Sequence, residues 1–369
     1  MKILVAVNQA RVLYDFKREL VGALIARGDD VALSFEEDFR AEYFRELGAT
    51  VSIAPIDPRG VNPIRDLKLA RYYRRLLRET RPDLVLTLTI KPNVYCGLAC
   101  RRLGVPRLAT ISGLGAAVNA GGALGRLAVA LYRLGLKNAE RVFCQNEAIA
   151  QRALKENIAR REQIVRVPGS GVDLERFQPL PYPKENAERI LLFIGRLMPD
   201  KGVLELLDAA REIRKSRPDV RIQILGASER GCATDALVDV AAKEGLVDYL
   251  GYQLDVRPFV ARADAVVLPS WHEGLSNVLL EAAASARPVL ASRVPGCAET
   301  FDEGGSGLGF EPRDANSLRD AIDRFFRLPR ETRAEMGRRG REKMEREFSR
   351  ADVVATYLRE IDDVARNQR

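Results

Sequence analysis

Two carboxylates, Glu273 and Glu281, lie in the turn and the helix of a predicted strand–turn–helix unit in the second half of the chain. The apolar run 266–268 predicts a buried strand, Gly274 permits a sharp turn, and Ser276 is a preferred N-cap residue for the following helix. A helix N-terminus beside the carboxyl end of a strand favours an anion, because its free N–H groups and its dipole point there. A capped unit that faces solvent explains the same residues, so the spacing alone does not establish a site.

A second candidate set follows another predicted strand, 189–194, where Gly195-Arg196 and Lys201-Gly202 bound a loop. Open α/β sheets bind ligands at the carboxyl ends of their strands. The guanidinium and the ammonium are expected to reach one phosphate group, and the glycines let the backbone approach it. Taken alone, the loop is better explained as a basic surface segment. The Walker A pattern is absent and no D-x-D occurs in the sequence, so we expect no metal held by carboxylates on a diphosphate.

Together the two sets describe one ligand. Arg196, Lys201 and the helix start near Ser276 would meet the negative charge of a diphosphate. Glu281 suits the vicinal hydroxyls of a ribose, and Glu273 suits sugar hydroxyls at the other end of the diphosphate. The combination predicts a nucleotide diphosphate sugar, bound as a substrate without a cofactor or a metal.

These residues need sheets to position them, and the chain alternates predicted strands and helices throughout. In the first half, strands are expected at 2–8, 30–34, 51–55, 84–90, 107–111 and 141–146. In the second half, they are expected at 189–194, 220–225, 247–250, 266–268 and 288–292. The tail from 333 is expected to be helical. This alternation is typical of parallel, doubly wound α/β sheets, so we predict two such domains facing each other across a cleft.

A stretch with three prolines in five residues, 179–183, marks the predicted linker between the domains. Two domains are also expected from length, because 369 residues exceed what a single core usually supports. The expected division has a first domain at 1–178, a linker at 179–186, a second domain at 187–345 and a last segment at 346–369.

The net charge of +8 is unevenly placed along the chain. Residues 1–183 carry 29 Lys and Arg against 19 Asp and Glu, a balance of +10, whereas 184–369 carry 30 against 32, a balance of −2. The helix expected at 64–80 is strongly basic, which either a solvated surface or contact with anionic lipid explains. The first domain is therefore expected to meet an anionic partner. Nucleic acid is not expected, because no recognisable binding motif accompanies the charge.

No apolar stretch approaches the roughly 20 residues that span a bilayer, and the N-terminus lacks a signal-peptide pattern. The protein is expected in the cytoplasm, and its basic first domain is expected to hold it peripherally on the inner face of an anionic membrane. Five cysteines without a C-x-x-C, and a single histidine, His272, argue against a zinc site. The sequence does not indicate an oligomeric state.

Three motifs of the second half are Gly195-Arg196 with Lys201-Gly202, the glutamates at 273 and 281, and the Pro-Gly-Cys-Ala-Glu-Thr run at 295–300. On these motifs the chain resembles the family 4 glycosyltransferases of the GT-B fold, along essentially its whole length. The first half is similar to a narrower group that builds lipid-linked glycans, through the segments at 89–93, 110–115 and 168–173. That group includes enzymes that add an N-acetylhexosamine, often α-1,3-linked N-acetylgalactosamine, to an undecaprenyl-diphosphate sugar.

The resemblance implies a role for each donor-side residue. Arg196 and Lys201 would hold the diphosphate, Glu281 the ribose, and Glu273 the donor sugar. Backbone N–H groups of the turn would contact the distal phosphate or the sugar, and the base would lie near Gly226 and Gly251-Tyr252. These backbone and base positions are Gly195, Gly226, Gly251, Tyr252, Gly274, Leu275, Ser276 and Asn277. The resemblance also implies that the last helix crosses back onto the first domain.

The acceptor side departs from the wider family. Many members carry a histidine in the first domain, and this sequence has none there. The positions expected in that neighbourhood are Arg11, Lys91, Asn93, Ser112 and Gly113. The only histidine, His272, would either touch the sugar or cap the turn.

The function implied is retaining transfer of a hexose or N-acetylhexosamine from a nucleotide sugar, expected to be UDP-linked, to a lipid-diphosphate-linked sugar. Such a step belongs to the assembly of a bacterial O-antigen, capsule, exopolysaccharide or glycoprotein glycan. Two alternatives remain open at this point. A nucleotide-sugar 2-epimerase shares the architecture but normally needs more acid–base residues, and a non-enzymatic anion-binding module leaves the paired glutamates unexplained.

Overall fold

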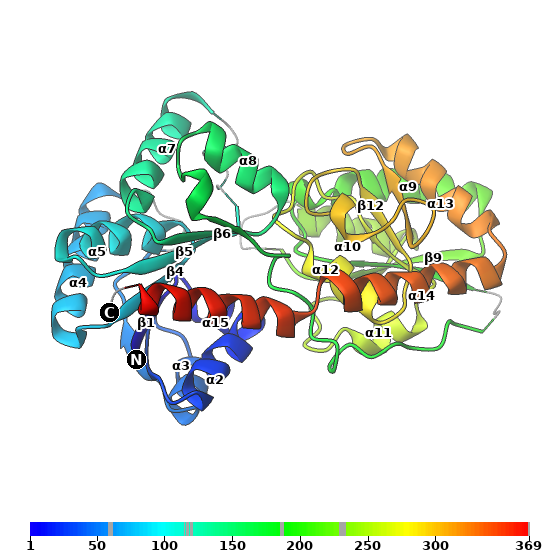
Figure 1. Ribbon diagram of the computed structural model, residues 1–369. Helices are drawn as coiled ribbons and strands as arrows, with labels where there is room; N and C mark the ends of the chain where they lie inside the picture. The colour runs from blue at the N-terminus through cyan, green and yellow to red at the C-terminus, as the bar shows by residue number, and fades with distance from the viewer. Residues whose placement is uncertain are drawn as a thin grey trace. The chain divides into compact units, whose positions relative to one another are not determined.

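The computed structural model describes residues 1–57, 62–113, 115, 118, 121–184, 188–228 and 234–367. The chain divides into two compact units, the first comprising 1–170 and 351–369 and the second comprising 171–350. Each unit is an α/β fold with one parallel sheet between helices (Figure 1).

Unit 1 contains a seven-stranded sheet in the order β3-β2-β1-β4-β5-β6-β7, with every pair parallel. Its strands are nearly continuous apolar runs, as expected for a sheet covered on both faces. Their bounds are β1 Lys2–Ala6, β2 Asp30–Phe35, β3 Thr50–Ile53, β4 Leu84–Leu88, β5 Arg107–Ile111, β6 Arg141–Cys144 and β7 Ile164–Arg166.

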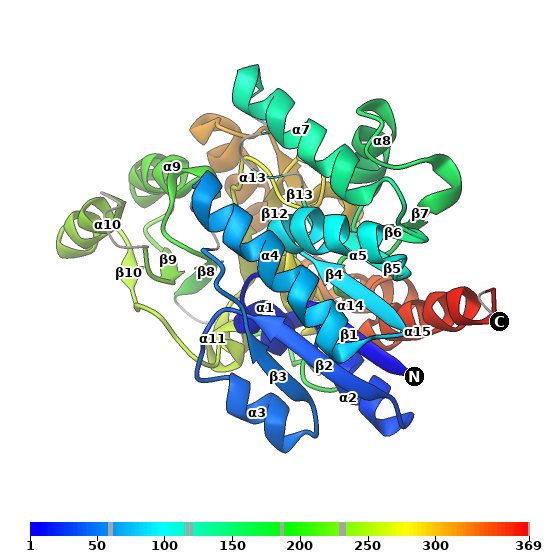
Figure 2. The ribbon, with the colours of Figure 1, turned by 90° about the vertical axis from the view of Figure 1, so that its left-hand side faces the viewer.

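The two faces of this sheet carry different helices. Alternate residues of β1 point to opposite faces, so Ile3 and Val5 enter one core and Leu4 and Ala6 the other. On the first face pack α1 Ala10–Phe16, α2 Arg18–Ala26, α3 Ala41–Glu46 and α15 Arg350–Arg366. On the second lie α4 Pro63–Thr80, the π-helix η1 Pro92–Cys96, α5 Gly97–Leu103 and α7 Gly122–Leu136, which Figure 2 shows facing the viewer. The helices α8 Glu147–Lys155 and η2 Arg161–Gln163 complete the unit.

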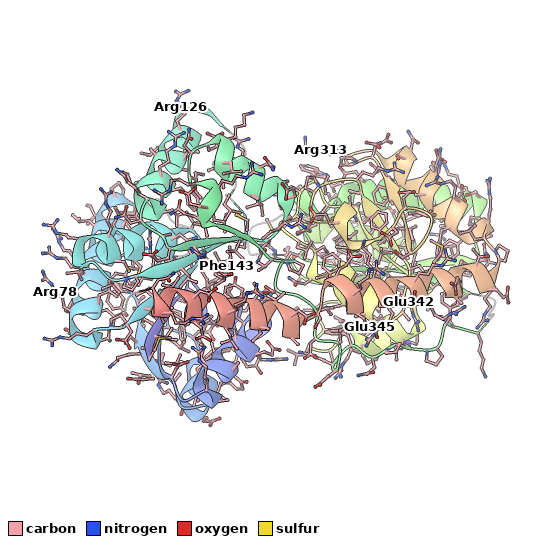
Figure 3. The ribbon with its side chains drawn as sticks, in the orientation of Figure 1. Arg78, Arg126, Phe143, Arg313, Glu342 and Glu345 are labelled. Atoms are coloured by element: carbon pink, nitrogen blue, oxygen red, sulfur yellow. The ribbon has the colours of Figure 1, made fainter. Side chains whose placement is uncertain are left out.

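The last helix, α15, belongs to unit 1 although the chain reaches it from unit 2. The Tyr357 ring stacks on Phe143, labelled in Figure 3, at 4.0 Å between centroids. Its hydroxyl lies 2.9 Å from Thr110 Oγ1, and Lys17 Nζ lies 4.4 Å from the ring centroid. The returning helix predicted by the resemblance is thus present and packed into the core.

Unit 2 contains a six-stranded parallel sheet in the order β10-β9-β8-β11-β12-β13. Its strands are β8 Arg189–Ile194, β9 Val220–Leu225, β10 Asp248–Tyr249, β11 Ala265–Leu268, β12 Val289–Ser292 and β13 Gly307–Phe310. Its helices are η3 Pro199–Lys201, α9 Val203–Ser216, α10 Thr234–Lys243, α11 Arg257–Arg262, α12 Asn277–Ala284, η4 Ala298–Thr300, α13 Ala315–Arg327 and α14 Arg330–Glu347. The helical tail expected from 333 consists of two helices, α14 and α15, with Phe348 and Ser349 between them.

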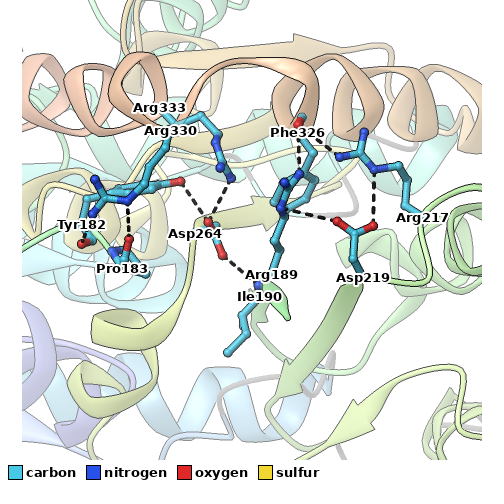
Figure 4. Close-up of polar contacts among 10 residues, drawn as sticks. All are labelled: Tyr182, Pro183, Arg189, Ile190, Arg217, Asp219, Asp264, Phe326, Arg330 and Arg333. Atoms are coloured by element: carbon cyan, nitrogen blue, oxygen red, sulfur yellow. Dashed lines mark hydrogen bonds and ion pairs between the residues drawn. The ribbon is translucent and has the colours of Figure 1, made fainter. Parts of the chain in front are cut away.

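The proline-rich segment expected to link the domains is part of unit 2. The buried side chain of Arg287 donates to the carbonyls of Leu180 and Pro181 at 3.1 and 2.7 Å. Arg330 donates to the carbonyls of Tyr182 and Pro183 at 3.2 and 2.9 Å (Figure 4). Two arginines therefore bind this extended backbone to the unit, and the chain passes between units at 170–171 rather than at 179–186.

Beside this segment, a buried carboxylate joins three parts of unit 2 (Figure 4). Asp264 accepts hydrogen bonds from Arg333 Nη1 at 3.0 Å, the Ile190 backbone N–H at 2.9 Å and the Tyr182 hydroxyl at 3.2 Å. The side chains of Arg333 and Asp264 are 5% and 10% exposed, so water screens the pair little. Loss of one partner would leave the other charge buried without compensation.

We therefore expect Arg333→Met to lower the free energy of unfolding of unit 2 by about 3–5 kcal/mol. Urea unfolding followed by the fluorescence of the only tryptophan, Trp271, reports on this unit. The matched control is Arg339→Met on the same helix, because that side chain is 57% exposed and pairs with Glu335 at the surface. Equal unfolding midpoints for the two variants would contradict the prediction.

Candidate functional site

The two loops singled out in the sequence lie side by side in unit 2. Strand β8 pairs with β11, with Leu191 opposite Ala265 and Phe193 opposite Val267. The loop 195–202 follows β8 and the turn 270–276 follows β11, so both emerge at the carboxyl edge of the sheet. The strand order also reverses direction between β8 and β11, and ligands of open α/β sheets bind at such a switch point.

The charged groups of the two loops meet directly. Lys201 Nζ lies 2.5 Å from Glu273 Oε1, and the Ser270 hydroxyl donates to the same oxygen at 2.8 Å. The lysine and glutamate side chains are 15% and 14% exposed, so the pair is sheltered but reachable. Arg196 lies on the same loop as the lysine and is exposed. A cation and a carboxylate held together at a switch point are equipped to meet a ligand that carries both phosphate and hydroxyl groups.

A glycine holds the two loops together. Gly202 has φ +69°, and a Cβ atom there would lie 2.0 Å from the Pro269 carbonyl oxygen. The Trp271 N–H donates to the Asp200 carbonyl at 2.9 Å across the same junction. Any larger residue at 202 would therefore separate the lysine from the glutamate.

The helix start predicted at Ser276 is confirmed. Helix α12 begins at Asn277, and the Ser276 hydroxyl accepts the Leu279 N–H at 3.3 Å. The 295–300 motif supports this turn, because the Ser276 N–H donates to the Gly296 carbonyl at 2.9 Å and a Cβ at Gly296 would lie 2.5 Å from the Gly274 carbonyl. Leu275 is buried, whereas Glu281 is partly exposed in the second turn of α12.

The positions expected near a nucleotide base follow the neighbouring strands β9 and β10, beside the end of β8. Gly226 has φ +147°, and a Cβ there would lie 1.8 Å from the Gly195 carbonyl. The Gly226 N–H donates to the Gly251 carbonyl at 2.9 Å. Beside them the Tyr252 side chain is 63% exposed, which leaves an aromatic face open to a planar ligand.

Around the Lys201–Glu273 pair lie groups that sequence reasoning did not select. Trp271 donates through Nε1 to Glu205 Oε1 at 2.9 Å, and the Arg313 guanidinium, labelled in Figure 3, lies 4.3 Å from the Trp271 ring centroid. Burial raises the pKa of the Cys297 thiol, the Glu273 charge raises it further, and Lys201 opposes the rise. In the sequence, this cluster could have been suspected from Trp271, because it is the only tryptophan and stands next to the only histidine, His272.

His272 itself is 57% exposed, and its Nε2 lies 3.8 Å from Asp200 Oδ2. It therefore faces solvent at the rim of the loop pair rather than lying beneath it.

Unit 1 has its own switch point, between β1 and β4. There Thr89 adopts φ +74°, a strained value for a β-branched residue, and its hydroxyl accepts the Asn8 N–H at 3.0 Å. Lys91 Nζ lies 2.7 Å from Asp66 Oδ1, with side chains 11% and 15% exposed. Burial raises the pKa of Tyr95, and the hydrogen bond and charge of Asp66 raise it further. Strained backbone and π-helices such as η1 are both enriched at functional sites.

The other expected acceptor-side residues are dispersed around this point. Asn93 is fully buried and donates to the Thr110 carbonyl at 2.8 Å. Arg11 pairs with Asp15 at 3.0 Å on the surface. Ser112 is exposed at the end of β5, and the Gly113 carbonyl accepts from the Tyr132 hydroxyl at 3.5 Å.

Sequence reasoning missed Asp66 as the partner of Lys91, and Tyr95 as a second partner of Asp66. Asp66 stood out as an acid in the first turn of a strongly basic helix.

Within the described part of the chain, no group of three or more His, Cys, Asp or Glu is placed to hold a metal ion. None of the helices described there combines the length and the apolarity needed to cross a bilayer.

Two family models match this chain, and between them they span most of both units. The model described as Glycosyl transferase 4-like domain matches residues 16–169, and that described as Glycosyl transferases group 1 matches residues 188–327.

Relatives and a solved structure agree with these models. The N,N'-diacetylbacillosaminyl-diphospho-undecaprenol alpha-1,3-N-acetylgalactosaminyltransferase of Campylobacter jejuni is 27% identical over 331 residues, which are 84% of this chain and 85% of that protein. The UDP-Gal:alpha-D-GlcNAc-diphosphoundecaprenol alpha-1,3-galactosyltransferase of Escherichia coli is 26% identical over 280 residues, 72% of each protein. A glycosyltransferase from Rickettsia africae superposes with a TM-score of 0.83 at 18% identity, over 99% of both chains. The predicted GT-B architecture is confirmed.

Proposed function

Because the chain belongs to the glycosyltransferases of the GT-B fold, we propose that it transfers a hexose or N-acetylhexosamine from a UDP-linked sugar to a sugar carried on a lipid diphosphate. The observation that carries this proposal is the Lys201–Glu273 ion pair at the switch point of unit 2. The names of the Campylobacter and Escherichia relatives support a sugar on a lipid diphosphate as the acceptor. The name of the Escherichia relative also supports UDP as the nucleotide of the donor. The step would serve the assembly of a bacterial O-antigen, capsule, exopolysaccharide or glycoprotein glycan.

On the donor side, the proposal assigns the diphosphate to Arg196, Lys201 and the N-terminus of α12. These groups would stabilise the negative charge that develops on the departing UDP. Glu281 would bind the ribose, and Tyr252 with Gly226 would border the base. We propose that no metal is needed, because the sequence offers cations in place of a D-x-D motif. Chelation of divalent cations should then leave the rate unchanged.

For the transfer step, we propose retention of configuration without an enzymic nucleophile. The bond from the anomeric carbon to the UDP oxygen breaks, and the bond to the acceptor oxygen forms on the same face of the sugar. The acceptor proton passes to the departing phosphate oxygen, so no side chain needs to remove it. Glu273 would stabilise the positive charge that builds on the anomeric carbon. An α-linked donor would then yield an α-glycoside.

The test uses purified full-length protein and two assays. A panel of nucleotide sugars is first screened for release of the nucleoside diphosphate, and the active donor is then incubated with a lipid-diphosphate sugar. The expected result is a lipid product one sugar longer, with an α anomeric signal by NMR. A 2-epimerised nucleotide sugar as the only product would identify an epimerase. Binding without turnover would identify a non-enzymatic anion-binding module, and either result would reject transfer.

On the acceptor side, we propose that Lys91, held by Asp66, binds the acceptor at the switch point of unit 1. Lys91→Met is expected to raise the KM for the lipid-linked acceptor about tenfold, because one charged contact is worth about 1.4 kcal/mol or more. The KM for the nucleotide sugar should stay unchanged. The control is Lys68→Met, an exposed lysine on α4. An unchanged acceptor KM in Lys91→Met would remove this residue from the acceptor site.

We also propose that the protein is peripheral on the inner face of the cell membrane. The basic balance of residues 1–183 supports this, since each Lys or Arg near an anionic surface contributes about 1 kcal/mol. The protein should pellet with anionic vesicles at low salt and be released at high salt. Failure to pellet at low salt would reject peripheral binding.

A further inference from the structure

Unit 1 carries a groove between α4 and α5 whose arginines have no assigned part in the proposed transfer reaction. Figure 2 shows the two helices side by side on the face turned to the viewer. The groove has a volume of about 620 Å³ and is lined by residues of α4, η1 and α5. This is enough for a small headgroup with a few methylene groups, and pockets for small molecules begin at about 300 Å³.

The lining is apolar at one end and basic at the other. Leu67, Ala70, Arg71 and Arg74 follow one another at helical spacing on a single face of α4. On α5, the order from Leu98 to Arg101 and Arg102 is the same. Each helix thus presents an apolar residue first and arginines about one turn or more later, so four guanidinium groups gather toward one end of the groove.

Among the described residues, no carboxylate lies within ion-pair distance of Arg71, Arg74, Arg101 or Arg102. Neighbouring cations on α4 do have partners, since Arg75 pairs with Glu79 and Arg65 with Asp57.

Arg74 lies close to other positive charges of this surface. The positive charges of Arg78 and Arg102 lower the pKa of its guanidinium, and its buried Nε has no hydrogen-bond partner within the described chain. Like charges gathered without an anion repel one another, so a bound anion would relieve the repulsion.

We propose that this groove binds the phosphate of an anionic phospholipid, with the arginines on the phosphate and the first part of the acyl chain along Leu67 and Leu98. Arginine matches phosphate geometry through paired N–H donors, which favours a phosphate over a simple chloride.

The surrounding surface favours a lipid over a soluble phosphate. Ile64 and Leu67 on α4 are 70% and 51% exposed, and Leu124 and Leu127 on α7 are 53% and 56% exposed. Exposed apolar side chains beside a basic cluster are typical of surfaces that enter the interfacial region of a bilayer. The site would seat one lipid by its headgroup, in addition to the general attraction of a basic domain to an anionic membrane.

The first experiment compares two double variants with the same change in charge. Arg74→Gln with Arg102→Gln removes groove arginines, and Arg65→Gln with Arg75→Gln removes paired arginines outside it. Full-length protein is sedimented with phosphatidylcholine vesicles that contain a minor fraction of phosphatidylglycerol. The groove variant is expected to lower the partition coefficient at least about tenfold and the control at most about threefold. Equal losses would mean general attraction only and would overturn the site.

The second experiment removes the vesicle surface. A short-chain phosphatidylglycerol, kept below its micelle concentration, is titrated into the protein by calorimetry, with inorganic phosphate as competitor. The groove is supported as the site if the wild type still binds the short-chain lipid in the presence of inorganic phosphate and if Leu67→Gln weakens this binding. Leu67 is half exposed, so this variant should remain folded. Displacement by inorganic phosphate at equal concentration, or binding that Leu67→Gln leaves unchanged, would reject a lipid site.

Discussion

Lys201→Ala is expected to lower kcat by about 10²–10³-fold while the protein stays folded. In the proposed reaction, this ammonium faces the diphosphate as the bond to the anomeric carbon breaks, when its negative charge is largest. The side chain comes from η3, whose end is fixed by Gly202 against Pro269. Its position is therefore set before the substrate arrives, so its loss removes a preorganised charge that water does not replace.

The measurement is steady-state transfer with a saturating donor, together with thermal unfolding followed by Trp271 fluorescence. The matched control is Lys215→Ala, because Lys215 also pairs with a glutamate in unit 2, Glu212, but is 72% exposed. The control should retain full kcat. Wild-type kcat in Lys201→Ala would reject the donor site as assigned here.

The geometry at the proposed donor site was predictable because its signals are local or follow a topological rule. The strand before Pro269, the turn at Gly274 and the cap at Ser276 each depend on neighbouring residues, and the structure has them where the sequence indicates. Lys201 and Glu273 are 72 positions apart, yet both follow buried strands. The switch-point rule places such strand ends together without knowledge of side-chain packing.

The contacts that sequence reasoning missed depend on how helices and loops pack. Asp66 and Lys91 pair only because α4 and η1 lie next to each other at a particular register. The sequence carries no local signal for the pair of Asp264 and Arg333, which the structure buries. The proline segment was interpreted as a free linker because its partners, Arg287 and Arg330, lie more than a hundred positions away.

Strand β13 was missed for a different reason. Two of its four residues are glycine, which has low strand propensity. In the structure, a Cβ at Gly307 would lie 2.5 Å from the Val289 carbonyl, and one at Gly309 would lie 2.7 Å from Glu303 Oε2. The glycines are thus required by close packing, a requirement that propensity alone does not reveal.

Glu273→Gln is expected to lower kcat about 10²-fold with little change in stability. The amide keeps the shape of the side chain and can still accept the Ser270 hydrogen bond, but it no longer carries the charge that holds Lys201. In the proposed reaction, the same charge faces the anomeric carbon. Glu212→Gln, in the exposed pair with Lys215, provides the control and should behave as the wild type. Full activity in Glu273→Gln would show that the carboxylate charge has no part in the reaction.

The double variant of Lys201→Ala and Glu273→Gln distinguishes two ways in which the pair can act. Groups that work as a unit give non-additive losses, so the double variant should be within about threefold of the slower single variant. Independent roles predict that the two losses multiply, giving about 10⁴-fold or more. The 2.5 Å contact between Nζ and Oε1 favours the first outcome, because removal of either charge also displaces the other from its place. Multiplied losses would mean that the two groups contact separate parts of the donor, and that the ion pair seen here opens when the donor binds.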